Sequence, residues 1–198
     1  MPRNVLVFLT DDHAQWCTGA DGHDAVHTPT IDHLAATGTR MTNAFCPTPV
    51  CSPARASFYT GRLPSQHGVH DHISPDADGR GWLDEETTLP ELFADAGYET
   101  ALFGKWHCGQ PEQDEVFEHA FGVRDAEGYR PWYATPDGDR RVTDRALDFL
   151  RADRDADRPF FGVVGYTATH SPWEGNPERL VAPYRDAVSV PAESTYSF

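Results

Sequence analysis

Four short groups of residues carry side chains that can bind metal, act as nucleophiles or hold anions. They are Asp11-Asp12, Cys51-Ser52-Pro53-Ala54-Arg55, Gly104-Lys105-Trp106-His107 and Thr169-His170-Ser171-Pro172. Adjacent carboxylates at the end of a buried strand repel each other and need a cation, and their hard oxygen atoms suit Ca²⁺ or Mg²⁺. For Asp11 and Asp12 alone, a solvated acidic turn is the more ordinary interpretation in so acidic a chain.

Cys51 directly precedes a predicted short helix over residues 52–60. A helix N-terminus offers free N–H groups and partial positive charge, which lower the pKa of a thiol. Arg55 follows at the helical spacing that brings its guanidinium back toward Cys51. Taken singly, Cys51 is more often a small buried apolar residue and Arg55 a surface cation, so only the combination indicates chemistry.

Alternating strands and helices must position these groups. The continuously apolar runs at residues 4–10 and 160–166 are typical of strands buried on both faces of a parallel sheet. Further predicted elements are strands over residues 39–45 and 98–103, helices over 28–38, 52–60, 88–97, 141–151 and 177–185, a loop over 64–83 and an irregular stretch over 110–139. This alternation predicts an α/β fold with helices on both faces of the sheet. Because ligands bind at the carboxyl ends of such strands, we expect the polar groups that follow three of the strands to converge.

The charge balance limits the partners. The 198 residues include 16 Lys+Arg and 31 Asp+Glu, a formal net charge of -15, and the length suits one domain or part of one. Nucleic acid and anionic membrane surfaces select basic proteins, so neither is an expected partner. The chain shows no signal-peptide pattern, and its apolar runs fall short of the ~20 residues that span a bilayer, so we expect a soluble cytoplasmic protein with reduced cysteines.

Taken in order, the motifs resemble those of one family. Cys51-Ser52-Pro53-Ala54-Arg55, followed by Thr60-Gly61-Arg62, resembles the sulfatase signature C-x-P-x-R with its downstream T-G-R. The opening strand with Asp11-Asp12, the helix beginning at Thr28-Pro29, the Gly104-Lys105-Trp106-His107 run and His170-Ser171-Pro172 resemble further sulfatase motifs. The chain is identified as a member of the formylglycine-dependent, arylsulfatase-like sulfatases. This resemblance implies an alkaline-phosphatase-like α/β fold with a mostly parallel central sheet flanked by helices.

The resemblance also implies a mechanism and its cofactors. A formylglycine-generating maturation enzyme would convert Cys51 to 3-oxoalanine, and one hydroxyl of the hydrated aldehyde would attack the sulfur of a small sulfate ester. The second hydroxyl would then expel sulfate, with help from Ca²⁺ or Mg²⁺. By position, the cation ligands would be Asp11, Asp12 and modified Cys51. Arg55 would hold the modified residue, Lys105 would offset charge on the sulfate and the diol, His107 would assist breakdown of the sulfated intermediate, and His170 would bind sulfate near the leaving group.

The family pattern is incomplete in this chain. A second metal-binding pair, typically Asp-Asn, and a further active-site lysine do not follow His170, and family members are about twice as long. Residues 1–198 therefore resemble the N-terminal portion of a sulfatase catalytic domain without its C-terminal half. Two alternatives stay open: a phosphonate or phosphodiester hydrolase of the same superfamily, and a truncated, non-catalytic remnant.

Other histidines and cysteines have more ordinary interpretations. His67, His70 and His72 are close enough in sequence to suggest a metal site, but the surrounding run resembles a common family loop, so we predict a loop. Cys108, next to His107, is predicted to serve packing.

The acidic excess predicts a salt-dependent stability. Like charges on a solvated surface repel one another at low ionic strength, and salt screens that repulsion, as in proteins of salt-rich cytoplasm. We expect the melting temperature to rise between low and molar KCl, measured by thermal unfolding. A melting temperature that stays flat over that range would contradict this interpretation.

Overall fold

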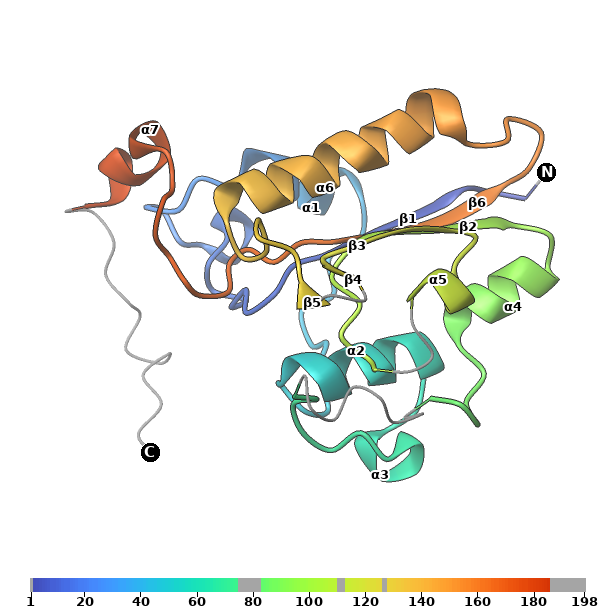
Figure 1. The fold of residues 1–198 in the computed structure, drawn as a ribbon. Helices are drawn as coiled ribbons and strands as arrows, with labels where there is room; N and C mark the ends of the chain where they lie inside the picture. The colour runs from blue at the N-terminus through green and yellow to red at the C-terminus, as the bar shows by residue number, and fades with distance from the viewer. Residues whose placement is uncertain (1, 75–82, 110–112, 126–127, 186–198) are drawn as a thin grey trace.

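A parallel four-stranded sheet organises the chain (Figure 1). The computed structural model describes residues 2–74, 83–109, 113–125 and 128–185. Strands β1 (Val5–Leu9), β6 (Phe160–Gly165), β2 (Glu99–Gly104) and β3 (His119–Gly122) lie in that spatial order, and all three pairings are parallel. A separate antiparallel pair joins β4 (Arg124–Asp125) to β5 (Gly128–Tyr129).

Helices cover both faces of the sheet, which confirms the predicted α/β class (Figure 1). On one face, α6 (Pro136–Asp148) packs Val142 and Ala146 against Phe103 of β2 and Val164 of β6. On the other, α2 (Cys51–Thr60) and α4 (Leu89–Asp95) enclose a second cluster that includes Tyr59, Leu102, Trp106, Phe161 and Val163.

The remaining helical segments are short or peripheral. They are η1 (Gly19–Asp21), α1 (Pro29–Thr37), α3 (Pro64–His67), α5 (Gln113–Val116), the π-helical turn η3 (Phe149–Asp153), α7 (Glu178–Val181) and η4 (Ala182–Tyr184). Proline in the first turn starts α1, α3, α4 and α6, where a missing backbone N–H has no cost. Across the described ranges, every helix is too short or too polar to cross a membrane.

The two central strands follow the sequence prediction, whereas β1 departs from it. Every residue of β2 and β6 is buried. In β1, by contrast, burial alternates, and the side chains of Leu6 and Phe8 are 36% and 57% exposed. The expected burial of this strand on both faces is therefore wrong for the described chain, because Val5 and Val7 pack against the second cluster while the opposite face, with Leu6 and Phe8, is left exposed.

Three local predictions are also wrong. Residues 39–45 form no strand, and Met41 and Phe45 are largely exposed. The stretch 110–139, predicted to be irregular, contains α5, β3 and the first turn of α6, which Thr135 caps by accepting a hydrogen bond from Gly138 N at 3.1 Å. The predicted loop 64–83 begins with α3, and its residues 75–82 lie outside the described ranges. β3 escaped prediction because it has only four residues and no continuous apolar run.

One glycine makes the close approach of β2 and β6 possible at the carboxyl edge. Gly104 ends β2 with a φ of +108°, and a Cβ built there would lie 1.9 Å from the carbonyl oxygen of Gly165. Lys105 N donates to that same carbonyl at 2.9 Å. The backbone that carries Lys105 therefore depends on the absence of a side chain at residue 104.

We predict that Gly104→Ala lowers the free energy of unfolding by about 3 kcal/mol or more, because it adds a backbone clash to a strained φ. Gly97→Ala is the matched control, since Gly97 has a φ of +84° but open space around its Cβ position. It should lose only about 1 kcal/mol. Chemical denaturation measures both, and equal losses would show that the contact with Gly165 is unimportant.

Candidate active site

Residues from four segments meet at the carboxyl edge of the sheet. Asp11 follows β1, Lys105 and His107 follow β2, the segment leading to His170 follows β6, and Cys51 opens α2. Backbone hydrogen bonds join the first and third of these segments: Asp11 N donates to Ala168 O at 3.1 Å, and Thr169 N donates to Asp11 O at 2.7 Å. The predicted convergence of the polar strand ends is confirmed.

Asp11, Arg55 and Lys105 form a buried charge cluster. Their exposed fractions are 4%, 3% and 1%. Lys105 Nζ donates to Asp11 Oδ2, and an Arg55 guanidinium nitrogen lies 3.9 Å from Asp11 Oδ1. Arg55 also donates to the carbonyl oxygen of Lys105 at 2.7 Å. Buried charges persist only when paired, and here two cations surround one carboxylate, so the cluster carries a net positive charge.

Cys51 is the first residue of α2, with Val50 as the N-cap. The predicted helix over residues 52–60 therefore begins one residue earlier, at Cys51. Ser52 lies in the first turn, is fully buried, and accepts a hydrogen bond from Ile73 N at 3.0 Å. This bond fastens the segment around residue 73 to the N-terminal end of α2, beside Cys51.

His107 is held in one tautomer by the same segment. Its Nε2 lies 3.1 Å from the carbonyl oxygen of Ile73. A carbonyl only accepts, so Nε2 carries the proton and Nδ1 holds a lone pair. Nδ1 is buried and has no hydrogen-bond partner among the described residues. Burial, and then the charge of Lys105, lower the pKa of His107 to about 4, so the ring is neutral near pH 7.

His72 also reaches this site, which the sequence prediction missed. The Cys51 Sγ and one ring nitrogen each of His72 and His107 lie within 4.8 Å of one another. Of the two other histidines of the predicted loop, His67 instead ends α3, where it is buried and bonds to Ser57 Oγ at 3.0 Å, whereas His70 is exposed and outside any helix. The spacing of the three histidines did not separate His72 from His67 and His70, because its position depends on how the segment folds back onto α2.

The segment after β6 is fixed from α6. Both carboxylate oxygens of Asp139 accept backbone hydrogen bonds, from Thr167 N at 2.8 Å and Ala168 N at 2.7 Å. His170 follows, with Nε2 3.9 Å from the carboxylate of Asp12, whose side chain is 63% exposed. Asp139 is thus a positioning residue that the sequence did not single out.

Tyr133 is a third residue, after His72 and Asp139, that the sequence prediction did not assign to the site. Burial, and then the charges of Asp11 and Cys51, raise the pKa of its phenol to about 12. Its hydroxyl is therefore near enough to the site to sense those charges, and it stays protonated at neutral pH. Tyr133 lies just before α6, in the stretch predicted to be irregular.

Asp11 and Asp12 offer the carboxylate oxygens that a hard cation selects. Ca²⁺ takes about six to eight oxygen ligands. These two carboxylates supply fewer, and one oxygen of Asp11 already accepts from Lys105. Their position at the carboxyl edge and their chemistry nevertheless suit such an ion.

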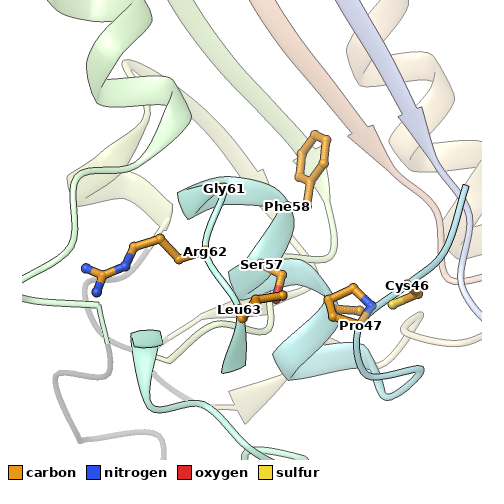
Figure 2. A pocket seen from close by; sticks show the side chains of 8 residues that line it. Cys46, Pro47, Ser57, Phe58, Gly61, Arg62 and Leu63 are labelled. Atoms are coloured by element: carbon orange, nitrogen blue, oxygen red, sulfur yellow. The ribbon is translucent and has the colours of Figure 1, made fainter. Parts of the chain in front are cut away.

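A shallow pocket of about 360 Å³ lies beside α2 and includes none of the predicted site residues (Figure 2). Figure 2 shows Cys46 and Pro47 on the segment before the helix, Ser57 and Phe58 on the helix, and Gly61, Arg62 and Leu63 after it. Arg62 forms an ion pair with Glu86 at 2.9 Å, so Glu86 already balances its positive charge beside this pocket.

The family model described as Sulfatase matches residues 3–190. The chain belongs to the sulfatase family. It is 31% identical to the N-acetylgalactosamine-6-sulfatase of Canis lupus familiaris over 86% of this chain and 40% of that protein. It is 29% identical to the N-acetylglucosamine-6-O-sulfatase of Bacteroides thetaiotaomicron, over 89% of this chain and 32% of that protein. The chain thus spans about two fifths of the length of these curated relatives or less.

Solved structures place this sulfatase chain in the expected fold. The structure of BT4656 in complex with its substrate D-glucosamine-2-N,6-O-disulfate aligns with a TM-score of 0.79 and 27% identity. That alignment covers 96% of this chain and 39% of the other. The predicted alkaline-phosphatase-like α/β fold is confirmed, and the match corresponds to the N-terminal portion of the family.

The burial of His107 predicts a pH-dependent stability. Its pKa falls from the ordinary 6.5 to about 4 in the folded chain. Between pH 4 and pH 6.5, His107 is mostly protonated in the unfolded chain and mostly neutral in the folded chain. The stability present above pH 6.5 is therefore lost as the pH falls toward 4.

We expect an NMR titration of the metal-free chain to give a pKa of about 4 for His107. In His107→Gln, which keeps a donor for Ile73 O, the slope of unfolding free energy against pH in this window should be shallower by roughly 1 kcal/mol per pH unit. Equal slopes in the two proteins would contradict the assignment.

Proposed function

We propose that this sulfatase-family chain forms part of a sulfuric ester hydrolase that cleaves sulfate monoesters. The observation that carries the proposal is the net positive, buried charge cluster of Asp11, Arg55 and Lys105 beside the N-terminal end of α2, where Cys51 lies. A sulfate ester is an anion, and the whole chain carries a net charge of -15. Local positive groups must therefore hold the substrate, and buried cations do so more strongly than solvated ones.

Residue 51 is the proposed reacting position. Conversion of Cys51 to 3-oxoalanine by a maturation enzyme would supply a hydrated aldehyde as the nucleophile, the covalent strategy expected of the family. Cys51 is partly exposed at the helix end, so a substrate can reach it. The α2 N–H groups and Arg55 orient and stabilise negative charge there.

Asp11, Asp12 and the modified residue 51 would hold the divalent cation, Ca²⁺ or Mg²⁺. When bound, such an ion polarises the sulfate oxygens and lowers the pKa of a coordinated hydroxyl. Lys105 donates to Asp11 and so orients one carboxylate toward the common edge. Asp12 remains exposed on the solvent side of that edge.

His107 and His170 have different proposed roles, proton transfer for His107 and anion binding for His170. His107 offers a neutral, buried Nδ1 that is able to accept a proton from a hydroxyl at residue 51, since Nε2 is committed to Ile73 O. His170 donates Nδ1–H to the Ser171 carbonyl at 2.6 Å, which leaves Nε2 directed to the site as an acceptor, or as a donor once protonated. Asp139 keeps that segment in place.

The proposed substrate is a sulfated amino sugar. Curated relatives are an N-acetylgalactosamine-6-sulfatase and an N-acetylglucosamine-6-O-sulfatase, and a solved neighbour holds a glucosamine disulfate. These support a hexosamine 6-sulfate as the first substrate class to test. The chemistry of the charge cluster fits any tetrahedral oxyanion ester, so phosphate and phosphonate esters belong in the same assay.

The test uses the complete reading frame that contains this chain, coexpressed with a formylglycine-generating enzyme. We predict that mass spectra of the peptide with residue 51 show the aldehyde, and that the protein releases sulfate from hexosamine 6-sulfate and aryl sulfate. Cys51→Ala should lower kcat by at least about a thousandfold because the nucleophile is gone. Cys46→Ser, which removes an exposed cysteine, should leave kcat unchanged.

Other outcomes would favour the alternatives. Faster cleavage of phosphonate or phosphodiester substrates would replace the sulfatase activity with the related hydrolase. A modified residue 51 with no turnover of any ester would support a non-catalytic remnant, and a persistent thiol with no sulfate release would overturn the proposal.

A further inference from the structure

The unmodified site contains ligands of a different kind from the two carboxylates. Cys51, His72 and His107 present one sulfur and two nitrogen atoms, all within 4.8 Å of one another. Thiolate and imidazole are soft or intermediate ligands that select Zn²⁺ and similar transition metals, whereas carboxylates select Ca²⁺ and Mg²⁺. Around a tetrahedral zinc ion, sulfur and nitrogen ligands lie about 3.3–3.5 Å apart, so only a small closure would bring the three atoms to bonding positions.

His107 is already prepared as a ligand. Its Nε2–H is held by Ile73 O at 3.1 Å, the type of outer contact that fixes the tautomer of metal-binding histidines. Its Nδ1 is buried and lacks a hydrogen-bond partner among the described residues, and the residue is 8% exposed. A buried acceptor without a partner is costly, so a cation or donor at this position stabilises the chain.

The two other candidate ligands, His72 and Cys51, lie where solvent can reach them. His72 is exposed, and its ring meets that of His107 edge to face with centroids 4.7 Å apart. It lies one residue before Ile73, whose N–H is fixed to Ser52 on α2 at 3.0 Å. Cys51 is the first residue of the ten-residue helix α2, and it is only partly buried, so its sulfur is within reach of an ion from solvent. The nearby cations Lys105 and Arg55 oppose a metal ion, but both are turned to Asp11.

We propose that the unmodified form of this chain binds a soft transition-metal ion such as Zn²⁺ through Cys51 Sγ, His72 and His107 Nδ1. The thiol proton leaves to solvent as the sulfur–metal bond forms, and water occupies the fourth position. This site requires the thiol, so the precursor holds a soft ion until residue 51 is modified. It shares its cleft with the proposed sulfatase site, but it does not depend on sulfatase activity.

The consequence is a competition at residue 51. A thiolate bound to zinc is less available to alkylating agents and to the maturation enzyme, because both act on the free sulfur. A soft ion would thereby delay conversion of Cys51, and a chelator would release it.

The test uses the complete reading frame produced without the maturation enzyme, with the thiol at residue 51 verified by intact mass. Titration with Co²⁺ alone should produce a thiolate-to-cobalt charge-transfer band that Zn²⁺ abolishes. Cys51→Ser should lose the band, and His72→Ala should weaken Co²⁺ binding by roughly tenfold or more. Because His72 is exposed, that variant should fold as the parent does, which circular dichroism checks.

The matched controls are His70→Ala and Cys46→Ser, an exposed histidine and an exposed cysteine outside the cluster. Both should keep the band and its midpoint. The proposal is overturned if the parent gives no band, if the band disappears in Cys46→Ser, or if His72→Ala and the parent bind Co²⁺ equally. Sulfate release by the matured protein is scored separately, so failure of that activity leaves this result unaffected.

Discussion

One carboxylate held between two buried cations is the interaction on which the candidate site depends. Asp11 comes from the end of β1, Lys105 from the end of β2, and Arg55 from within α2. All three side chains are 4% exposed or less, so each needs a partner of opposite charge. Removing one partner of a buried ion pair lowers the free energy of unfolding by about 3–5 kcal/mol. The ion pairs among these three residues therefore fix the relative positions of the ends of β1 and β2 and of helix α2. Cys51, one helical turn from Arg55, is placed as a consequence.

The backbone around this cluster is held by contacts that carry no catalytic chemistry. Gly104 and Gly165 allow β2 and β6 to meet at the edge, and the Lys105 amide bonds to the Gly165 carbonyl. Asp139 of α6 accepts two backbone hydrogen bonds from the segment after β6, and Thr169 of that segment donates to the carbonyl oxygen of Asp11. The site is thus built on parallel strands and stiffened by short hydrogen bonds, which suits groups that must hold a developing charge without reorganising.

Short sequence patterns predicted the helices and strands whose formation depends mainly on nearby residues. β2, β6 and α4 follow from apolar runs and helix punctuation, and the convergence of Asp11 with Lys105 follows from the geometry of parallel strands. The exposure of Phe8 depends on which face of β1 other elements cover, and the existence of β3 depends on its pairing with β2; no short sequence pattern records either. His72, Tyr133 and Asp139 reach the site from segments without a chemical motif, so only the folded chain reveals them. The family resemblance named the residues of the site, whereas the structure shows what each one touches.

The central claim is that Asp11 and Lys105 act as one coupled unit, and a double-mutant cycle on the free energy of unfolding tests it most directly. The variants are Asp11→Asn, Lys105→Met and their combination, each checked for native circular dichroism. We predict that each single change costs about 3–5 kcal/mol, because it removes the hydrogen-bonded partner of a buried charge and Arg55, 3.9 Å from Asp11, compensates only in part. The double variant should cost less than the sum by more than about 1 kcal/mol. Additive losses in the double variant would contradict the account, because they would show that the two charges contribute to the fold independently.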